Sequence, residues 1–540
     1  MSKTAGITLA LGLLLSWGCS QSTAPSSDLG LRDLQLDSTA TDRGLTDSAI
    51  AEAGAKDQAG SDSATRDAGR DLPTVDGAIA DASHDSAPPV DQGPADSSID
   101  AIASDAGTVA VTIDRFIGHS DPDAIYPTDV ATDSLGRMIF AGYYLRNQGS
   151  VTGLFVAAYS ATGTSLWTVN FAKAAVADHV ALAIDKQDRI VIASRYADGL
   201  DFGAGPIAAD SAGEGLLLVL DKSGKYLSHR TFGGDGRDQP YGVAIDPQSG
   251  DTAIVGLTDS NGFQLAGASS SLQAKSGGDE VFAIRLGTQA LVQRFGDAAL
   301  GTRSTTLGNA IIDATQRLCF VGGSGKRLDF GNNQVLPAVK TTSTTPFYVC
   351  LNKSGSAVAL RAFSQGPDNA ATSLAAAANG DVIVAGRASS GVLLGNTQLN
   401  LVGNTLAFVG RLDGAAVNTR WAWAIDNAAT DAPRVAAGQD RVVVIEKYFA
   451  AAKVAGDTLP KPANSFDIAV IGLELATGKE AFALSLNALK PPSSHYAIAA
   501  NQKRAYFVGA YDGFVSLYYH GTTHKGFSST NDAYLGALSW

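Results

Sequence analysis

Cysteine thiols are the most reactive side chains of this 540-residue sequence, which contains only three of them: Cys19, Cys319 and Cys350. A thiol can be acylated, oxidised to a disulfide or bound to a metal ion, depending on its surroundings. Cys19 lies alone near the N-terminus, whereas Cys319 and Cys350 are neighbours within one later segment. We therefore expect one chemistry for Cys19 and a different one for the other two.

The residues before Cys19 follow a signal-peptide pattern, because Lys3 precedes an apolar run from Ala5 to Leu15. As a helix this run would span about 16 Å, far less than a hydrocarbon core of roughly 30 Å, so we expect no retained transmembrane helix. The following Ser16-Trp17-Gly18-Cys19 resembles the lipobox of bacterial lipoproteins. That resemblance implies export, lipidation of Cys19 and a stable lipid anchor to a membrane.

Two further points concern this anchor, namely its membrane and an alternative to it. Ser20 after the lipidated position resembles lipoproteins sent to the outer membrane, which implies a cell-envelope location on its periplasmic or outer side. Alternatively, ordinary signal-peptidase cleavage near Ser22-Thr23-Ala24 would remove Cys19.

The segment after Cys19 has the composition of a disordered tether. Residues 20–108 contain no Phe, Trp or Tyr, and they hold 16 Asp and one Glu against four Arg and one Lys. Such a chain buries too little apolar surface to offset its ordering entropy. The sequence therefore predicts a signal peptide over 1–18, a disordered Asp/Ala/Ser-rich tether over 19–108 and a folded region over 109–540.

The folded region is almost neutral, with 34 basic and 36 acidic side chains. It has no basic excess to neutralise phosphates, which argues against nucleic-acid binding. Its histidines show no metal-ligand spacing, and even His520 and His524 fit a solvated loop better than a zinc site. Asp121-Pro122-Asp123 and Asp235-Gly236-Arg237-Asp238 lack a Ca²⁺-loop pattern and favour turn roles. We predict no metal site, no cofactor and no catalytic residues.

Internal repeats reveal how the folded region is organised. Seven units each begin with an alternating strand that ends in a polar turn, as in Val243-Ala244-Ile245-Asp246. The turn positions are Asp133, Asp185, Asp246, Asp313, Ala377, Ala437 and Ala500. A second strand, a third strand and, in all units but the last, a fourth strand follow. The third strand of each unit is anchored at Phe155, Leu216, Phe282, Phe347, Phe408, Ala469 or Tyr534. Four antiparallel strands per unit predict an all-β, single seven-bladed β-propeller.

The ends of the chain predict how the ring closes. The last unit stops at Trp540 after its third strand, while Asp114-Arg115-Phe116-Ile117-Gly118 precedes the first unit and carries the pattern of a fourth strand. Pairing that N-terminal strand with the last unit completes the seventh blade and leaves no blade with unpaired backbone groups.

At this level the sequence resembles the bacterial seven-bladed β-propeller repeat family, with its Val-Ala-x-Asp turn, Val-x-Gly strand and Phe-Gly-Gly end. The resemblance covers nearly all of residues 114–540. It implies an exported or surface protein without a defined activity, and Asp201-Phe202-Gly203 and Asp329-Phe330-Gly331 then mark repeated structural turns.

Cys319 and Cys350 fall on the second and third strands of the fourth unit. Neighbouring strands in an exported protein allow a disulfide. However, Cys319 aligns with Ile139, Val191 and Ile383, which favours an inert buried thiol. Both alternatives are open at this stage.

We therefore expect a monomeric, envelope-anchored binding or scaffolding lipoprotein that holds an unknown protein or polysaccharide partner on its variable loops. The alternative is a propeller enzyme, such as a lyase, a hydrolase or a quinoprotein-like enzyme, with a site at the mouth of the central channel. A purely structural surface component is a third possibility.

Overall fold

The computed structural model describes residues 112–540 except 120–123, 147–150, 173–178, 197–198, 204, 209–212, 267–271, 274–277, 297–304, 340–342, 364–365, 390, 401–404, 415–417, 427–431, 455–456, 463–465, 487–494 and 520–521. The predicted signal peptide, the tether and Cys19 lie outside the described residues. Among the described residues, no helix is long and apolar enough to cross a bilayer.

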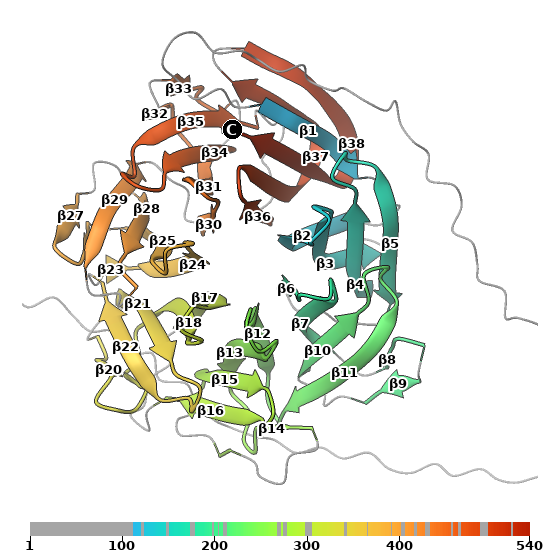
Figure 1. Cartoon of the computed structure of the whole chain (residues 1–540), viewed down its shortest axis with the longest axis vertical. Helices are drawn as coiled ribbons and strands as arrows, with labels where there is room; N and C mark the ends of the chain where they lie inside the picture. Colours follow the sequence, from blue (N-terminus) through green and yellow to red (C-terminus); the bar gives the residue numbers. More distant parts are fainter. Residues whose placement is uncertain are drawn as a thin grey trace, which may run out of the picture. The chain divides into compact units, whose positions relative to one another are not determined.

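The described residues form seven small antiparallel sheets arranged in a ring, which confirms the predicted all-β, seven-bladed propeller (Figure 1). Blade 1 contains β2 (Ala124–Thr132), β3 (Met138–Arg146), β4 (Val151–Tyr159) and β5 (Ser165–Ala172). Blade 2 contains β6 (Ala181–Ile184), β7 (Ile190–Tyr196), β10 (Glu214–Leu220) and β11 (Tyr226–Gly233). Blade 3 contains β12 (Asp238–Ile245), β13 (Thr252–Thr258), β15 (Glu280–Leu286) and β16 (Leu291–Phe295).

The next three blades repeat this arrangement, with the innermost strand first in each case. Blade 4 contains β17 (Thr305–Ile312), β18 (Leu318–Ser324), β21 (Ser343–Leu351) and β22 (Ala357–Ala362). Blade 5 contains β24 (Ala370–Ala376), β25 (Val382–Ala388), β28 (Leu406–Leu412) and β29 (Thr419–Asp426). Blade 6 contains β30 (Arg434–Ala437), β31 (Arg441–Tyr448), β34 (Asp467–Glu474) and β35 (Glu480–Ser485).

Blade 7 combines both ends of the chain. It contains β36 (Tyr496–Asn501), β37 (Arg504–Tyr519), β38 (Thr522–Ser539) and, on the outside, β1 (Thr112–His119). Strand β1 pairs antiparallel with β38, with Phe116 opposite Gly536 and Gly118 opposite Tyr534. The predicted closure by the N-terminal strand is therefore confirmed.

Short strands decorate the blades. The two-stranded hairpins are β8 (Leu200–Asp201) with β9 (Pro206–Ile207), β19 (Leu328–Asp329) with β20 (Val335–Leu336), β26 (Val392–Leu394) with β27 (Thr397–Leu399), and β32 (Ala452–Val454) with β33 (Asp457–Leu459). Strand β14 (Gln264–Leu265) pairs with β11, and β23 (Gly366–Pro367) pairs with β21.

Glycine and aromatic residues form matched pairs within the blades. In blade 3, Gly256 of β13 lies directly opposite Phe282 of β15, and a Cβ atom on Gly256 would come within 2.3 Å of the Phe282 ring. Gly142 and Phe155 repeat this pair in blade 1. The aromatic side chain occupies the space that a second-strand side chain would need, which explains why the Val-x-Gly strand precedes an aromatic third strand.

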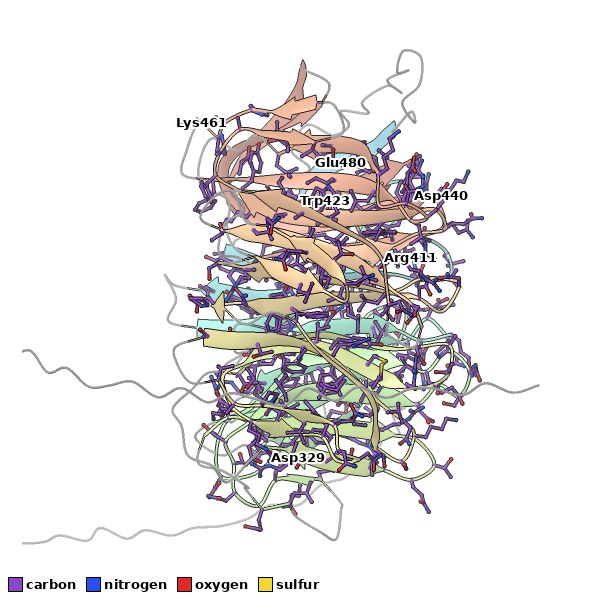
Figure 2. The ribbon with its side chains drawn as sticks, turned by 90° about the vertical axis from the view of Figure 1, so that its left-hand side faces the viewer. Asp329, Arg411, Trp423, Asp440, Lys461 and Glu480 are labelled. Atoms are coloured by element: carbon purple, nitrogen blue, oxygen red, sulfur yellow. A yellow bond between two sulfur atoms is a disulfide. The ribbon has the colours of Figure 1, made fainter. Side chains whose placement is uncertain are left out.

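The hydrophobic core lies between neighbouring blades. Phe140 and Phe155 of blade 1 belong to the same buried cluster as Tyr506, Val508 and Leu535 of blade 7. Polar contacts also join blades, as in blades 5 and 6, where Trp423 Nε1 donates to Glu480 Oε1 over 2.7 Å; both residues are labelled in the edge-on view of Figure 2. Burial between blades thus depends on the complete ring.

Candidate functional site

The seven innermost strands surround the axis of the ring. Each of β2, β6, β12, β17, β24, β30 and β36 contacts the next one around the circle, and β36 contacts β2 (Figure 1). The second strand of each blade runs antiparallel to the innermost strand, so it ends at the face of the ring where the innermost strand begins. We call this face the entry face; Tyr126 near the start of β2 pairs there with Tyr143 of β3.

Side chains at equivalent positions of the innermost strands link each blade to the next. Thr128 Oγ1 donates to the Val180 carbonyl, and Thr372 Oγ1 donates to the Pro433 carbonyl. One position further on, a side-chain oxygen accepts from the next blade's backbone N–H: Asp129 from Leu182, Asn309 from Leu374, and Ser373 from Val435. In blade 6 this same position is occupied by Arg434.

Asp129 is a partly buried carboxyl at the axis. Its Oδ1 and Oδ2 accept the backbone N–H groups of Val130 and Leu182 over 2.9 and 2.8 Å. Burial nevertheless raises the pKa of Asp129 from 3.8 to about 6, against the opposing effects of these two hydrogen bonds and of the positive charge of Arg434. Asp129 can therefore change its charge as the pH passes through about 6.

His179 enters the same region just before β6. Its Nε2 lies 2.9 Å from the Tyr241 carbonyl, and its ring stacks on the Tyr241 ring at 5.4 Å. Burial, with the nearby positive charge of Arg434, lowers the pKa of His179 to about 3. The imidazole is therefore neutral at physiological pH, and a neutral Nε2–H donates to the carbonyl.

Arg434 is the cation of this region. It is the first residue of β30, it is partly buried, and its Nη1 donates to the Thr372 carbonyl over 2.9 Å. Burial lowers the pKa of its guanidinium, and the electrostatic effects of Tyr496 and Asp129 oppose that change. Arg434 and Asp129 thus influence each other although blade 7 lies between their two blades.

Three partly buried rings lie together where blades 1 and 7 meet. Tyr126 and Tyr143 stack with centroids 5.0 Å apart and an interplanar angle of 16°. The His495 ring meets both edge-on at 5.3 and 5.4 Å, and the Tyr143 hydroxyl is 3.0 Å from His495 Nε2. The electrostatic effect of His495 also reaches His179.

These six side chains, Asp129, His179, Arg434, Tyr126, Tyr143 and His495, form what we call the axial cluster. It brings together a cation, a carboxyl with a raised pKa, two imidazoles and two phenols from blades 1, 2, 6 and 7. A few converging polar groups beside aromatic rings are typical of ligand binding, and carboxyls with perturbed pKa values concentrate at functional sites.

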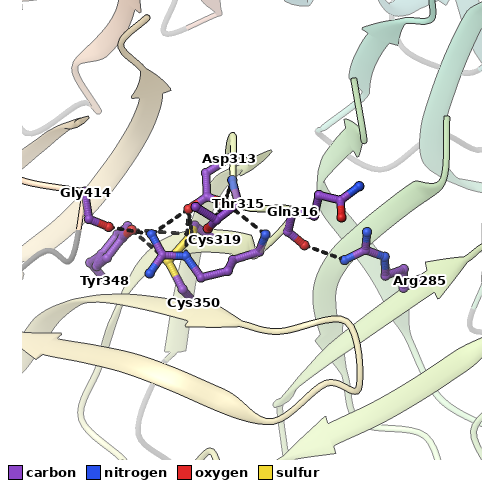
Figure 3. The surroundings of a disulfide bond; sticks show 9 residues. Arg285, Asp313, Thr315, Gln316, Cys319, Tyr348, Cys350 and Gly414 are labelled. Carbon is purple, nitrogen blue, oxygen red and sulfur yellow. Dashed lines mark hydrogen bonds and ion pairs between the residues drawn. A yellow bond between two sulfur atoms is a disulfide. The ribbon is translucent and has the colours of Figure 1, made fainter. Parts of the chain in front are cut away.

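Cys319 and Cys350 lie directly opposite each other on β18 and β21 and form a disulfide with an S–S distance of 2.01 Å (Figure 3). Both are fully buried, and the Tyr348 hydroxyl donates to Cys350 Sγ over 2.7 Å. Asp313, Cys319 and Cys350 are also the one group of described residues with ligand atoms close enough for a metal ion. Bonded sulfur atoms carry no thiolate, so this group does not suit a metal.

The acidic segments considered for Ca²⁺ have other roles where they are described. Asp238 is buried and accepts from the Thr258 and Ser260 hydroxyls, while Asp235 Oδ1 accepts from Asn261 N–H. Residues 121–123 and 520 lie outside the described residues, as does the side chain of residue 524.

The two Asp-Phe-Gly segments are turns, as predicted. Asp201 Oδ1 accepts from Gly203 N–H, and Asp329 Oδ1 accepts from Gly331 N–H. A groove of about 950 Å³ lies beside the second of these turns, between β16 and β19. Within it Arg327 pairs with Asp329 at 3.2 Å.

No family model and no curated protein sequence matches this chain. Among solved structures, 103 chains match. The chain is similar to polysaccharide lyase Uly1, with a TM-score of 0.39 and 10% identity over 78% of this chain and 91% of that one. It is similar to a protein of unknown function from Dyadobacter fermentans, with a TM-score of 0.37 and 10% identity over 67% and 98%.

A third match is a puromycin-hydrolyzing peptidase of Mycobacterium tuberculosis, with a TM-score of 0.40 and 10% identity over 75% of this chain and 53% of that chain. At such low identities and TM-scores these matches assign no activity to this chain. What the fold and the site define is a seven-bladed β-propeller with a polar and aromatic cluster at its axis.

Sequence reasoning missed the axial cluster completely. Its members come from four blades and share no motif, and His179 and His495 were known only as histidines without metal spacing. The one available signal was positional. Arg434 occupies a place that Asp129 takes in blade 1 and that the uncharged Ala181 and Ser373 take in blades 2 and 5.

Proposed function

We propose that this protein is an exported, envelope-anchored binding or scaffolding lipoprotein whose propeller holds a partner at the axial cluster on its entry face. In this proposal Cys19 carries the lipid anchor to the outer membrane and residues 19–108 form the tether. The chain is a monomeric relative of the bacterial seven-bladed repeat family. The partner is a protein or a polysaccharide.

One observation carries the binding role: partly buried charged and aromatic side chains from four blades converge at the axis. The polar atoms of a purely structural ring would be expected to be satisfied within or between adjacent blades, as Asn309 is by Leu374. The axial cluster instead has the titratable Asp129 and Arg434 at a strand position where blades 2 and 5 carry the uncharged Ala181 and Ser373.

Capture experiments with envelope glycans and envelope proteins test this role. We expect the purified protein to retain a partner, and we expect Tyr126→Ala combined with His495→Ala to release it. Leu135→Ala is the matched control, because Leu135 is 67% exposed in the turn that follows β2, at the opposite face. Loss of capture in the control, or retention in the double variant, would contradict binding at the entry face.

The lipid anchor has its own test. Cells that express the wild-type protein should incorporate labelled palmitate into it and retain it in the membrane fraction. Cys19→Ser should abolish both. Equal labelling of the two proteins would refute lipidation of Cys19.

A propeller enzyme is the second candidate, and one observation favours it: a carboxyl with a pKa of about 6 lies near a hydrogen-bonded Tyr143–His495 pair. Such groups suit general acid–base chemistry, as in a lyase or a hydrolase. Turnover of an envelope polymer that is lost in Tyr143→Phe, without loss of binding, would establish this candidate over a pure binding module.

A further inference from the structure

Arg434 differs from four other buried or partly buried arginines of the ring. Arg285, Arg294, Arg317 and Arg411 each contact a carboxylate, at 2.8, 3.0, 2.6 and 2.7 Å respectively. Among the described residues the one hydrogen-bond acceptor of Arg434 is the Thr372 carbonyl. A guanidinium has five N–H donors in a planar fork that fits a carboxylate, so Arg434 has donors available for an anion at the axis.

Three aromatic rings belong to the same axial cluster as this cation. Tyr126 and Tyr143 form a stacked pair, with the His495 ring against their edges. Rings of this kind present a flat apolar surface together with hydroxyl and imidazole groups for hydrogen bonds. A sugar ring needs both, because its C–H faces pack on aromatic rings while its hydroxyls exchange hydrogen bonds.

We propose that the axial cluster binds an acidic saccharide, with Arg434 contacting the carboxylate of a uronic-acid unit and Tyr126 and Tyr143 packing against the sugar rings. This inference rests on the proposed binding function and names its ligand class. The aromatic surface favours a saccharide over a peptide carboxylate. The near-neutral folded region, with 34 basic and 36 acidic side chains, does not favour a polyphosphate.

The proposal includes a pH dependence that arises from Asp129. Arg434 of blade 6 is the charged group that acts on Asp129, and Tyr496 of blade 7 acts in turn on Arg434. His179 and His495 are the other titratable groups of the cluster with an imidazole ring. Ionised Asp129 repels a ligand carboxylate, whereas protonated Asp129 does not and can donate a hydrogen bond to it. Affinity for a uronate therefore rises as the pH falls from 8 to 5, while His179 is neutral throughout this range.

Calorimetric titration of the full-length purified protein tests the inference. The probes are trigalacturonate, the neutral analogue trigalactose and a peptide with a free C-terminal carboxylate. We expect trigalacturonate to bind at least about tenfold more tightly than trigalactose, because trigalactose has no carboxylate for charge-assisted hydrogen bonds to Arg434. We expect it to bind more tightly than the peptide as well, because the peptide has no sugar rings to pack on Tyr126 and Tyr143. Arg434→Gln should lose this preference, and Arg434→Lys should lose most of it, because Lys cannot form the fork.

Arg230→Gln is the matched control, since Arg230 is exposed on the outer strand β11, and it should bind like the wild type. Unchanged melting temperatures would show that the Arg434 variants are folded. Asp129→Asn should remove the rise in affinity at low pH. A uronate affinity that is equal in wild type and both Arg434 variants would overturn the inference.

The remaining outcomes separate the inference from the function on which it rests. Equal binding of trigalactose and trigalacturonate, lost in Tyr126→Ala, would overturn the anionic ligand but leave saccharide binding at the entry face intact. Tighter binding of the peptide would overturn the saccharide and leave the binding function. No binding of any probe overturns the inference, and the envelope-capture experiment then decides the function independently.

Discussion

Asp129→Asn should change how the stability of the ring depends on pH. In the folded protein burial raises the pKa of Asp129 from 3.8 to about 6. The folded state therefore binds this proton more tightly than the unfolded state does. Its stabilising contribution is full below about pH 3.8 and is lost as the pH rises through about 6. Asparagine cannot ionise, so the variant should lack this dependence.

The magnitude follows from the shift. At about 1.4 kcal/mol per pKa unit, the full difference is about 3 kcal/mol, and roughly half of it falls between pH 5 and pH 8. This is an upper bound, because the side chain retains an exposed fraction in which water screens its charge. Asparagine fits the position, since the equivalent Asn309 accepts from Leu374 N–H over 2.6 Å and donates to the Leu374 carbonyl over 2.9 Å.

Thermal unfolding of the wild type and the variant at pH 5 and pH 8 provides the assay. The wild type should lose stability between pH 5 and pH 8 through ionisation of Asp129, and the variant should not. The free energy of unfolding of Asp129→Asn minus that of the wild type should therefore be larger at pH 8 than at pH 5. The control is Asp188→Asn, because the Ser134 N–H lowers the pKa of Asp188, whose titration therefore lies below pH 5. A wild-type-to-variant difference that is the same at both pH values would refute the assignment of a raised pKa to Asp129.

Three further predictions concern the architecture. Deletion of residues 109–118 should lower the melting temperature sharply, because it removes the strand that pairs with β38 and each lost hydrogen bond costs about 1 kcal/mol. A deletion of equal length within residues 30–60 should leave the melting temperature unchanged. If Cys319 and Cys350 are bonded, the unfolded protein should gain the mass of two hydrogen atoms on reduction. The double variant Cys319→Ala with Cys350→Ala should lower the free energy of unfolding by about 3–4 kcal/mol, because the disulfide closes a loop of 31 residues. Arg294→Leu, which removes the guanidinium partner of the fully buried Glu280, should cost about 3–5 kcal/mol by denaturant unfolding. Arg327→Leu removes the partner of the partly exposed Asp329 and should cost at most about 1 kcal/mol; equal losses would contradict the role of burial.

The number of blades and the closure of the ring could be predicted from the sequence because both depend on local, repeated patterns. Each unit carries its own strand alternation and turn, and Asp313 illustrates why these are visible: its Oδ1 accepts the N–H groups of Thr315 and Arg317 within a few residues. The incomplete last unit and the spare N-terminal strand then left one arrangement that pairs every blade edge.

The sequence left the state of Cys319 and Cys350 open, since alignment with buried positions does not distinguish a thiol from a disulfide. Only the register decided it, because the pairing of β18 with β21 puts these two residues directly opposite each other.

The sequence by itself determined the circular architecture of this protein, whereas the tertiary structure alone revealed the axial cluster. Ring closure brings Asp129 and Arg434 near each other although they are far apart in the chain, and it desolvates both. Those effects depend on the distance and burial that the closed ring imposes, and neither quantity is encoded in a local pattern of residue types.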